Sequence, residues 1–575
     1  MNAKHLYILN RCLWGLLLVF LTSACKDDDN NIDNSALTLL SYTPENGTSI
    51  ASEGTVTLTF SKNVRQASET EITINDAATR VIITNNVVYC HYSLPYANKL
   101  TINIPSGALI DMDGSQAFEG ITLQYPLEIS RRLFDAVVDA NGNGNYTTIT
   151  EAIENAPSSS EEPYLIFVAD GNYNEMLSVS KPYIHLIGQS RENTCIQYAV
   201  NRTGNSDGTQ GSATDEAWEY SIKNSASPAR QDGYTTENEA VVLIKANSSG
   251  MDFYGENLSF INLFGADGKR YDGGLLLDGQ ADALMTRSDR IAFYNCRMVS
   301  YQDTWWVRMN SGDTYLQARN YADNCWIEGR TDYLYGNANL LVENSTFYNV
   351  TRTNQGNNVG GGPITAGSHY AGTNWGHVML NCTIDGDDVL KTLDSSSTTL
   401  SLGRPWQNEP ISVWINTTLN VPIRDGHWDD MSVLPKLYAE YNTMYNNQNI
   451  AVEDNIKKEY LVNNVYTPYE GPYVLDDVSS YTYENIIMGT DGWNPKEFYS
   501  DIPEIDKSSI KLNGTTLTWE GSSTALCYLV FKQVSGKWQY IANTVETFYE
   551  IDDMQGTYDV RAANRYGSLS PAASL

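Results

Sequence analysis

Apolar and polar residues alternate one by one in two stretches, one near each end of the chain. Residues 54–60 (Gly-Thr-Val-Thr-Leu-Thr-Phe) and 99–104 (Lys-Leu-Thr-Ile-Asn-Ile) show this in the first stretch, and residues 516–519, 538–540 and 556–561 show it in the second. A period of two is typical of antiparallel strands with one buried face. It predicts a small β-sandwich over residues 36–128 and another over residues 505–575. In the second, we interpret Trp519 and Tyr558 as core residues rather than as sugar-binding plates.

A different pattern fills the region between them. A tetrapeptide of Asn, a mostly small residue, any residue and an apolar residue begins at Asn295, Asn324, Asn344, Asn381 and Asn416, with spacings of 29, 20, 37 and 35 residues. A short recurrent strand with Asn at a corner and loops of variable length favours a parallel β-helix over residues 130–500. The alternative, a large β-sandwich, should repeat its strands about every 8–12 residues. Helical spacing is confined to 148–156, which could cap the solenoid.

The fold class is therefore predicted to be all-β: a right-handed parallel β-helix flanked by two small β-sandwiches. The first residues add an export signal. Lys4 and Arg11 flank the start of an apolar run over residues 13–21, which is too short to span a bilayer and ends in Thr-Ser-Ala before Cys25. Residues 1–24 are thus predicted to be a signal peptide.

Cys25 resembles the lipidated cysteine of bacterial lipoproteins; the alternative is an ordinary signal peptide with an incidental cysteine. Residues 25–35 form an acidic linker that begins Cys-Lys-Asp-Asp-Asp and resembles the signal sending some lipoproteins to the outer cell surface. A solvated spacer is the other interpretation. We expect an outer-membrane lipoprotein exposed on the cell surface, with a periplasm-facing protein as second choice, and its membrane contact would be the lipid anchor.

Charge and cysteine content exclude several classes of function. The formal net charge is −32, from 69 acidic and 37 basic residues, which argues against nucleic acid as a partner. The eight cysteines show no Cys-x-x-Cys spacing, so zinc-ribbon and redox sites have no support, and most of the six beyond Cys25 are expected to be core thiols. No ordered Ser-His-Asp set and no metal cluster is evident, and no cofactor is predicted.

Four short motifs in the middle of the chain carry the candidate chemistry. They are Gly279-Gln280-Ala281, Gln302-Asp303-Thr304, Asp332-Tyr333-Leu334-Tyr335-Gly336 and Gly403-Arg404-Pro405-Trp406. Two carboxylates, two amides, a guanidinium and an aromatic plate suit ester hydrolysis, with one acid to attack, one to move a proton and neutral donors for an oxyanion.

In this order the motifs resemble the signature of the pectin methylesterases, and the resemblance extends over residues 134–500. It includes Gly171-Asn172-Tyr173-Asn174-Glu175, the family's Gly-x-Tyr-x-Glu, and Gly492-Trp493-Asn494-Pro495 near the end; residues 200–238 look like an insertion. The flanking sandwiches look like bacterial Ig-like and fibronectin type III-like domains. We assign Glu175 to local structure or to rim contacts.

The resemblance implies a role for each matched residue. Asp332 would be the nucleophile, paired with Arg404, and Asp303 the general acid and then base. Gln280 and Gln302 would donate amide hydrogens to the oxyanion. Trp406 and Tyr335 would stack on sugar rings, with Trp305 and Trp306 as further aromatic groups at the cleft. Methyl-esterified pectin is the implied partner, and a monomer is expected.

Two departures from the family pattern bear on these expectations. Trp305-Trp306 replaces the usual Leu-Tyr after Gln-Asp-Thr, which would change the subsites. Ser345 stands where relatives often carry the cysteine that bonds the equivalent of Cys325, so that disulfide is not expected. Three alternatives stay open: a related lipoprotein acting on other esters or thioesters, a pectate lyase on a β-helix, and an inactive glycan-binding β-helix.

Overall fold

The structure is a computed structural model that describes residues 35–67, 70–94, 99–128, 131–160, 162–198, 200, 240–245, 251–263, 280–309, 317–354 and 357–574. Cys25, the predicted signal peptide, nearly all of the predicted insertion and Gly279 lie outside the described residues. The chain forms two compact units. The first consists of residues up to Tyr125 without 49–53 and 93–99, and the second consists of these two short segments and Pro126–Leu575.

The first unit contains antiparallel strands with one buried face. One sheet has the order β1-β3-β8-β7, from β1 (Leu39–Thr43), β3 (Glu53–Phe60), β8 (Val87–Ser93) and β7 (Ile82–Thr84). Another contains β11 (Ile121–Glu128), β9 (Lys99–Ile104), β5 (Thr73–Ile74) and β6 (Ala77–Ala78) in that order, and β4 (Val64–Gln66) pairs with β10 (Leu109–Asp111). Val56, Leu58 and Phe60 alternate with more exposed residues along β3, as the sequence pattern predicts.

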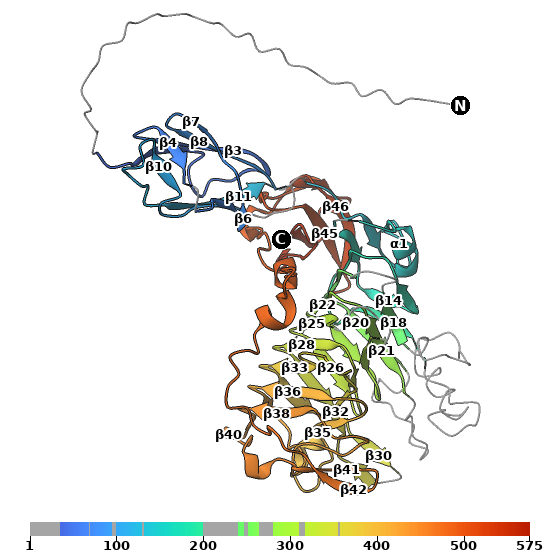
Figure 1. Cartoon of the computed structure of the whole chain (residues 1–575). Coiled ribbons are helices and arrows are strands. Elements are labelled where there is room, and N and C mark those ends of the chain that lie inside the picture. Colours follow the sequence, from blue (N-terminus) through green and yellow to red (C-terminus); the bar gives the residue numbers. More distant parts are fainter. Residues whose placement is uncertain are drawn as a thin grey trace, which may run out of the picture. The chain divides into compact units, whose positions relative to one another are not determined.

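Three parallel sheets form the β-helix of the second unit, and their strands stack coil upon coil from green to orange in Figure 1. The first sheet contains β12 (Ala136–Val138), β13 (Tyr164–Val168), β16 (Ile184–Gly188), β19 (Phe253–Glu256), β22 (Ile291–Tyr294), β25 (Arg319–Asp323), β28 (Asn339–Glu343), β33 (His377–Leu380), β36 (Ile411–Ile415) and β38 (Leu437–Tyr441). The second contains β14 (Gly171–Tyr173), β17 (Thr194–Tyr198), β20 (Ser259–Asn262), β23 (Arg297–Val299), β26 (Trp326–Gly329), β29 (Thr346–Asn349), β34 (Thr383–Gly386), β37 (Thr418–Leu419), β39 (Met444–Tyr445) and the antiparallel β40 (Gln448–Asn449).

The third sheet is the one that carries the candidate catalytic residues. Its seven strands are β15 (Leu177–Val179), β18 (Ala240–Lys245), β21 (Asp282–Arg287), β24 (Trp305–Val307), β27 (Leu334–Gly336), β32 (Pro363–Gly367) and β35 (Ser401–Pro405). The parallel β-helix predicted from the asparagine repeat is confirmed.

The repeated asparagines occupy the corner between the first and second sheets. Asn295, Asn324, Asn344, Asn381 and Asn416 all have φ between +49° and +55°, a left-handed conformation that Asn tolerates better than most residues. Four of their amides also pair between neighbouring coils: the Asn324 Nδ2 donates to Asn295 Oδ1 at 3.2 Å, and the Asn416 Nδ2 donates to Asn381 Oδ1 at 3.1 Å. Asparagine therefore recurs in the sequence because each coil needs a residue with a left-handed backbone at this corner.

One helix, α1 (Ile149–Asn155), packs at the start of the β-helix and confirms the helical spacing read from the sequence. Ile149, Ala152 and Ile153 are buried, and the Thr148 side chain caps its first turn. The Glu175 carboxylate accepts hydrogen bonds from the backbone N–H groups of Ile149 and Thr150, at 3.0 and 2.9 Å. Glu175 thus has the local structural role that we predicted for it.

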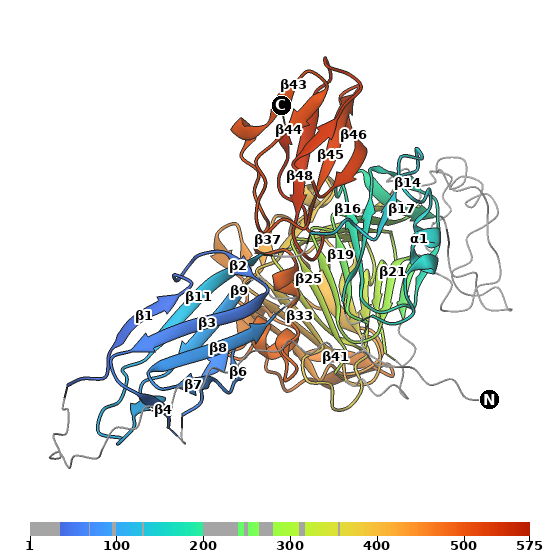
Figure 2. The same cartoon turned by 90° about the horizontal axis from the view of Figure 1, so that it is seen from above.

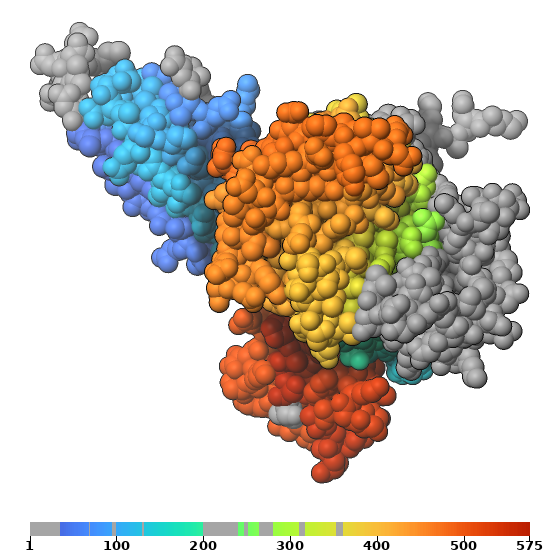
Figure 3. Space-filling model, turned by 90° about the horizontal axis from the view of Figure 1, so that it is seen from below, coloured from blue at the N-terminus to red at the C-terminus, as the bar shows by residue number. Residues whose placement is uncertain are grey.

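Short elements follow the last complete coil. The antiparallel hairpin of β41 (Glu459–Val462) and β42 (Val465–Pro468) lies at the end of the stack, where orange atoms form the surface in Figure 3. Short helical turns are η1 (Leu390–Thr392), η2 (Glu453–Asn455), η3 (Glu484–Met488), η4 (Pro495–Phe498) and η5 (Lys507–Ser509). Among the described residues, no helix is both long and apolar enough to cross a bilayer.

The C-terminal strands form two small antiparallel sheets, shown in red in Figure 2. One is β43 (Lys511–Asn513), β44 (Thr516–Thr518) and β47 (Phe548–Glu550); the other is β46 (Lys537–Thr544), β45 (Cys527–Val534), β48 (Tyr558–Ala563) and β49 (Ala573–Ser574). Trp519 and Tyr558 are buried between these sheets, which confirms their interpretation as core residues.

These sheets share a hydrophobic cluster with the outer face of the β-helix. Phe167 of the β-helix contacts Phe531 and Tyr540 of the C-terminal strands, with ring centroids 6.1 and 5.4 Å apart. The hydroxyl of Ser568 donates to the buried Glu256 carboxylate, whose pKa burial raises to about 7. Residues 505–575 therefore belong to the same compact unit as the β-helix.

The six described cysteines are all buried and unbonded, as expected of core thiols: Cys90, Cys195, Cys296, Cys325, Cys382 and Cys527. The hydroxyl of Ser345 accepts a hydrogen bond from the backbone N–H of Cys325 at 2.9 Å. The Ser345 hydroxyl therefore satisfies this backbone donor beside the unbonded Cys325.

Candidate active site

All five predicted catalytic residues lie on or immediately before strands of the seven-stranded parallel sheet. Gln280 precedes β21 by two residues, Gln302 and Asp303 precede β24, Asp332 precedes β27, and Arg404 lies within β35. Because parallel neighbours present the same end at the same edge, residues 124 positions apart in the sequence, from 280 to 404, come onto one surface.

Asp303 and Asp332 occupy equivalent positions on adjacent coils. The pairs Gln302–Thr331 and Trp305–Leu334 fix this register, so the backbones at the two aspartates lie one strand spacing of about 4.8 Å apart. Both have left-handed backbones, with φ of +63° and +49°, and both are buried. Their N–H groups donate to the carbonyls of Thr331 and Pro363, at 3.1 and 2.8 Å, so the unusual backbone conformation is anchored on the next coil.

Arg404 holds the Asp332 carboxylate in a two-pronged ion pair. Its Nε donates to Oδ1 at 2.8 Å and its Nη2 donates to Oδ2 at 2.5 Å. Burial raises the pKa of Asp332 above its ordinary value, and the charge and hydrogen bonds of Arg404 oppose that rise. Removing water from Arg404 lowers the pKa of its guanidinium, but Asp332 more than offsets this and the net shift is upward. The pair orients Asp332 and favours its charged form.

Two glycines of the motifs are required by close approach between coils. A Cβ on Gly403 would lie 2.0 Å from the Thr365 Oγ1, and a Cβ on Gly336, whose φ is +127°, would lie 1.9 Å from the Val307 carbonyl oxygen. No side chain fits at either position. The glycines beside Arg404 and Tyr335 therefore set the coil spacing on which the site depends.

The two glutamines also lie on adjacent coils. The Ala281 N–H donates to the Gln302 carbonyl at 3.2 Å, which brings the segments carrying Gln280 and Gln302 together. Both side chains are half-buried. Neutral amides at this edge, beside two carboxylates, can stabilise negative charge that develops on a carbonyl oxygen.

The prediction that Trp305 lines the cleft is wrong. Successive residues of a strand face opposite sides, so Trp305 and Trp306 cannot both face outward. Trp305 is fully buried, its ring packs edge-on against Phe293 at 5.5 Å, and its Nε1 donates to the Thr286 Oγ1 at 3.1 Å. Trp305 is a core residue of the β-helix.

Trp306, Tyr335 and Trp406 form the aromatic cluster on the outward side. Trp306 and Tyr335 stack with centroids 5.2 Å apart and planes 18° apart, and Trp406 lies 5.9 Å from Tyr335. The two tryptophans are half-buried, whereas only 4% of Tyr335 is exposed. Tyr335 therefore packs beneath the tryptophans and supports them. It offers little surface for stacking on a sugar ring, contrary to the prediction that it would do so.

Two residues of this cluster were missed by the sequence analysis. Tyr335 donates its hydroxyl to the fully buried carboxylate of Asp282, and the guanidinium of Arg308 lies 4.4 Å from the centre of the Trp306 ring. Asp282 could have been noticed as a charged residue directly before the apolar run Ala-Leu-Met in its strand. Arg308 lies two residues after Trp306, and residues two apart in an extended chain point to the same face.

Among the residues that the structure describes, no group of three His, Cys, Asp or Glu side chains is placed to bind a metal ion. His427 lies beside the strand that carries Arg404: its carbonyl accepts from the Leu402 N–H at 2.9 Å, and its Nδ1 lies 2.8 Å from the Glu440 Oε1. This buried pair supports the backbone that carries Arg404.

Comparison with known proteins gives one consistent family. The family model described as Pectinesterase matches residues 135–219 and 221–458. A probable pectinesterase/pectinesterase inhibitor 20 from Arabidopsis thaliana is 28% identical over 365 residues, covering 61% of this chain and 53% of the relative. A pectinesterase from Daucus carota is 29% identical over 314 residues, covering 53% of this chain and 81% of the relative.

The chain thus spans about half the length of the first curated relatives that it matches. Among solved structures, the pectin methylesterase from carrot aligns with a TM-score of 0.47 and 24% identity, over 62% of this chain and 93% of that one. The pectin methylesterase PemA from Erwinia chrysanthemi aligns with a TM-score of 0.46 and 24% identity, over 63% and 98%.

Proposed function

The chain belongs to the pectinesterase family, and from this premise we propose that it removes methyl esters from the galacturonate residues of pectin and releases methanol. The observation that carries the proposal is the position of the Asp332 carboxylate. Arg404 holds both of its oxygens, and Asp332 lies on the coil next to that of Asp303. One charged, oriented acid beside a second acid is what a covalent two-step ester hydrolysis needs.

In the first step, a carboxylate oxygen of Asp332 attacks the carbonyl carbon of the methyl ester. The carbonyl oxygen becomes an oxyanion, which the amides of Gln280 and Gln302 stabilise. When the tetrahedral intermediate collapses, the bond to the methoxy oxygen breaks, and Asp303 gives its proton to that oxygen. Methanol leaves, and an anhydride joins Asp332 to the galacturonate carbonyl.

In the second step, Asp303, now ionised, takes a proton from water as the water attacks the galacturonate carbonyl carbon. The bond to Asp332 breaks and returns the free carboxylate to Arg404. The product is a galacturonate carboxylic acid, and Asp303 is again protonated. Every proton is supplied and recovered within the site, so no cofactor is needed.

The test is methanol release from highly methylated homogalacturonan. The wild-type protein should release methanol, whereas Asp332→Asn, which keeps the side-chain size and removes the nucleophilic charge, should lose at least about a thousandfold in kcat. Asp388→Asn is the matched control, because Asp388 is fully exposed on the β-helix surface. Equal rates for wild type and Asp332→Asn would exclude the covalent mechanism.

One observation favours a second candidate, an esterase of the same mechanism acting on another ester or thioester. Trp306 with Arg308 on its face places a bulky, charged group beside the site. Robust turnover of small aryl esters or acyl thioesters, with no methanol from pectin and with dependence on Asp332, would favour this alternative.

We propose further that the protein is anchored to the outer membrane through Cys25 and exposed on the cell surface. The support is the short apolar run ending in Thr-Ser-Ala-Cys and the acidic residues that follow. Cells expressing the protein should incorporate labelled palmitate into it, and Cys25→Ser should abolish the label. Protease added to intact cells should digest the anchored protein; full protection would favour a periplasm-facing location.

A further inference from the structure

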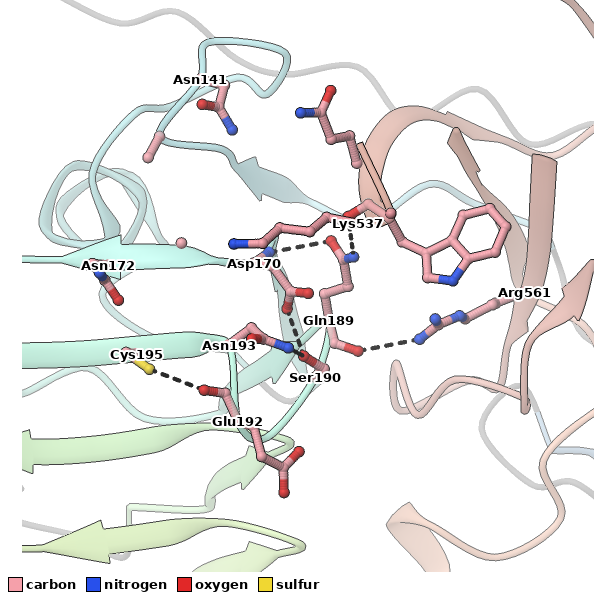
Figure 4. Close-up of a pocket in the computed structure, with 15 residues that line it drawn as sticks. Asn141, Asp170, Asn172, Gln189, Ser190, Glu192, Asn193, Cys195, Lys537 and Arg561 are labelled. Carbon is pink, nitrogen blue, oxygen red and sulfur yellow. Dashed lines mark hydrogen bonds between the residues drawn. The ribbon is translucent and has the colours of Figure 1, made fainter. Parts of the chain in front are cut away.

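A cavity of about 700 Å³ lies between the early coils of the β-helix and the β45–β46 hairpin of the C-terminal sheets, inside the second unit (Figure 4). Its walls come from residues 140–195 and 536–561, so it contains none of the catalytic residues. The volume is within the range of about 300–1,000 Å³ found for small-molecule sites. The catalytic mechanism gives this cavity no role.

Hydrogen bonds between the two walls hold the cavity open in one shape. Gln189, only 3% exposed, accepts from the Asp170 N–H at 3.1 Å and donates its own amide to the Trp538 carbonyl at 2.8 Å. Arg561 donates to the Gln189 carbonyl at 3.1 Å, a bond drawn in Figure 4. A single buried amide thus ties the β-helix to the hairpin, so a ligand would meet a preformed site.

The lining is rich in groups that bind hydroxyls. Five side-chain amides line it, and Asn172 and Asn193 among them are exposed. Asp170, which Figure 4 shows beside Ser190, accepts from the Ser190 and Thr194 hydroxyls through Oδ1, at 2.8 and 3.0 Å. Side-chain amides both donate and accept hydrogen bonds and carboxylates accept them, which are the interactions that sugar hydroxyls require.

The charges that line the cavity cancel. The two acids are Asp170 and Glu192, and the two bases are Lys537 and Arg561. Neighbouring partners keep this balance: Arg561 pairs with the buried Asp559, at 3.0 Å from Nε to Oδ2, and Glu192 pairs with Arg191, at 2.8 Å from Oε1 to Nε. The cavity therefore gives no net attraction to an anion or a cation, whereas an uncharged, hydroxyl-rich ligand finds both donors and acceptors. Trp538 adds an aromatic side chain to the same wall.

We propose that this cavity is a second, non-catalytic binding site for a short uncharged saccharide. Resting on the proposed function, the saccharide is a fully methyl-esterified segment of galacturonan, which carries no charge. A site for the esterified polymer, separate from the catalytic residues, would keep the enzyme on undigested substrate and release it from regions already converted to polyanion.

The test measures binding by calorimetry with the purified protein carrying Asp332→Ala, so that nothing is hydrolysed. The probe is a trimer of methyl-esterified galacturonate, compared with the de-esterified trimer. Asn172→Ala with Lys537→Ala removes two exposed side chains from the cavity. The matched control is Lys511→Ala with Asn513→Ala, exposed residues of the same types on β43 that do not line it.

We expect two binding events for the esterified trimer, with the cavity variant weakening one of them at least tenfold and the control weakening neither. When the cavity substitutions are made in the protein that keeps Asp332, the variant should release methanol from the trimer at the wild-type rate. A single binding event unchanged by the cavity variant would overturn the proposal, as would equal or tighter binding of the de-esterified trimer at this site. Binding in the cavity without any methanol release would refute the proposed function and leave the cavity site standing.

Discussion

The phenolic hydroxyl of Tyr335 donates to both carboxylate oxygens of Asp282, at 3.0 and 3.2 Å, across two coils of the β-helix. Both residues are buried, and the Tyr335 ring carries Trp306 on one side, with Trp406 tilted against it. A phenylalanine at position 335 could not make this bond. The tyrosine hydroxyl therefore fixes the ring that supports the two tryptophans by a polar contact.

Tyr335→Phe should lower stability and loosen the tryptophans. The variant removes a donor from a buried carboxylate, which should cost about 1–3 kcal/mol in the free energy of unfolding. Because the catalytic aspartates are untouched, KM for methylated pectin should rise more than kcat falls. Urea unfolding and steady-state kinetics measure the two effects. Tyr348→Phe is the control, since Tyr348 lies on another sheet. A fall in kcat with KM unchanged would contradict a positioning role.

Replacing Arg404 should alter the pH dependence of the reaction. Burial raises the pKa of Asp332 and Arg404 opposes that rise, so Arg404→Met should move the acid limb of kcat/KM to higher pH. Arg404→Lys keeps the charge but loses the two-pronged geometry, and it should mainly lower kcat, by roughly ten- to a hundredfold.

The chain supplies a matched control for this experiment. Arg290 holds Asp252 in the same two-pronged way, with distances of 2.6 and 2.7 Å, away from the catalytic strands. Arg290→Met should leave the acid limb in place. An unchanged limb in Arg404→Met would mean that Asp332 is not the group whose ionisation limits the rate.

Replacing Trp305 and replacing its neighbour Trp306 by alanine should have different effects, one mainly on stability and the other mainly on KM. Trp305→Ala removes a fully buried indole from the core and should cost about 3–5 kcal/mol of unfolding free energy. Trp306→Ala should change stability by less than half as much, and it should raise KM, because Trp306 faces the site. Denaturant melts combined with KM measurements separate the two. Equal losses of stability would contradict the assignment of opposite faces.

The sequence was sufficient to predict the β-helix because the asparagine repeat reflects a backbone need. Each coil turns at a residue with positive φ, and Asn appears there at Asn295, Asn324 and the later corners. The four motifs likewise predicted that Asp332 and Arg404 lie in one site, because their order along the chain resembles the family's catalytic signature. These features are local in the chain or carried by a family resemblance.

Contacts set by coil length could not be predicted in this way. Tyr335 meets Asp282 only because the intervening coils contain 21 and 29 residues, as the pairs Leu284–Trp305 and Trp305–Leu334 show. Which of Trp305 and Trp306 faces inward depends on the same register, and a shift by one residue would exchange them. The packing of Phe167 on Tyr540 joins residues 373 positions apart, and no sequence pattern in either strand indicates it.

The buried pair of His427 and Glu440 should make the stability of the β-helix depend on pH. Burial lowers the pKa of His427, but the charge and hydrogen bond of Glu440, together with the charge of Asp425, outweigh burial, and the net pKa lies above the ordinary value of 6.5. The folded state therefore binds the proton more tightly than the unfolded state, so this stabilisation is complete below pH 6.5 and is lost as pH rises through the folded pKa.

His427→Asn suits the left-handed backbone there, with φ of +63°, and removes the titration. The difference in Tm between wild type and His427→Asn should be largest near pH 5.5 and should shrink toward pH 9. A difference that grew with pH would show that His427 is held neutral in the folded protein.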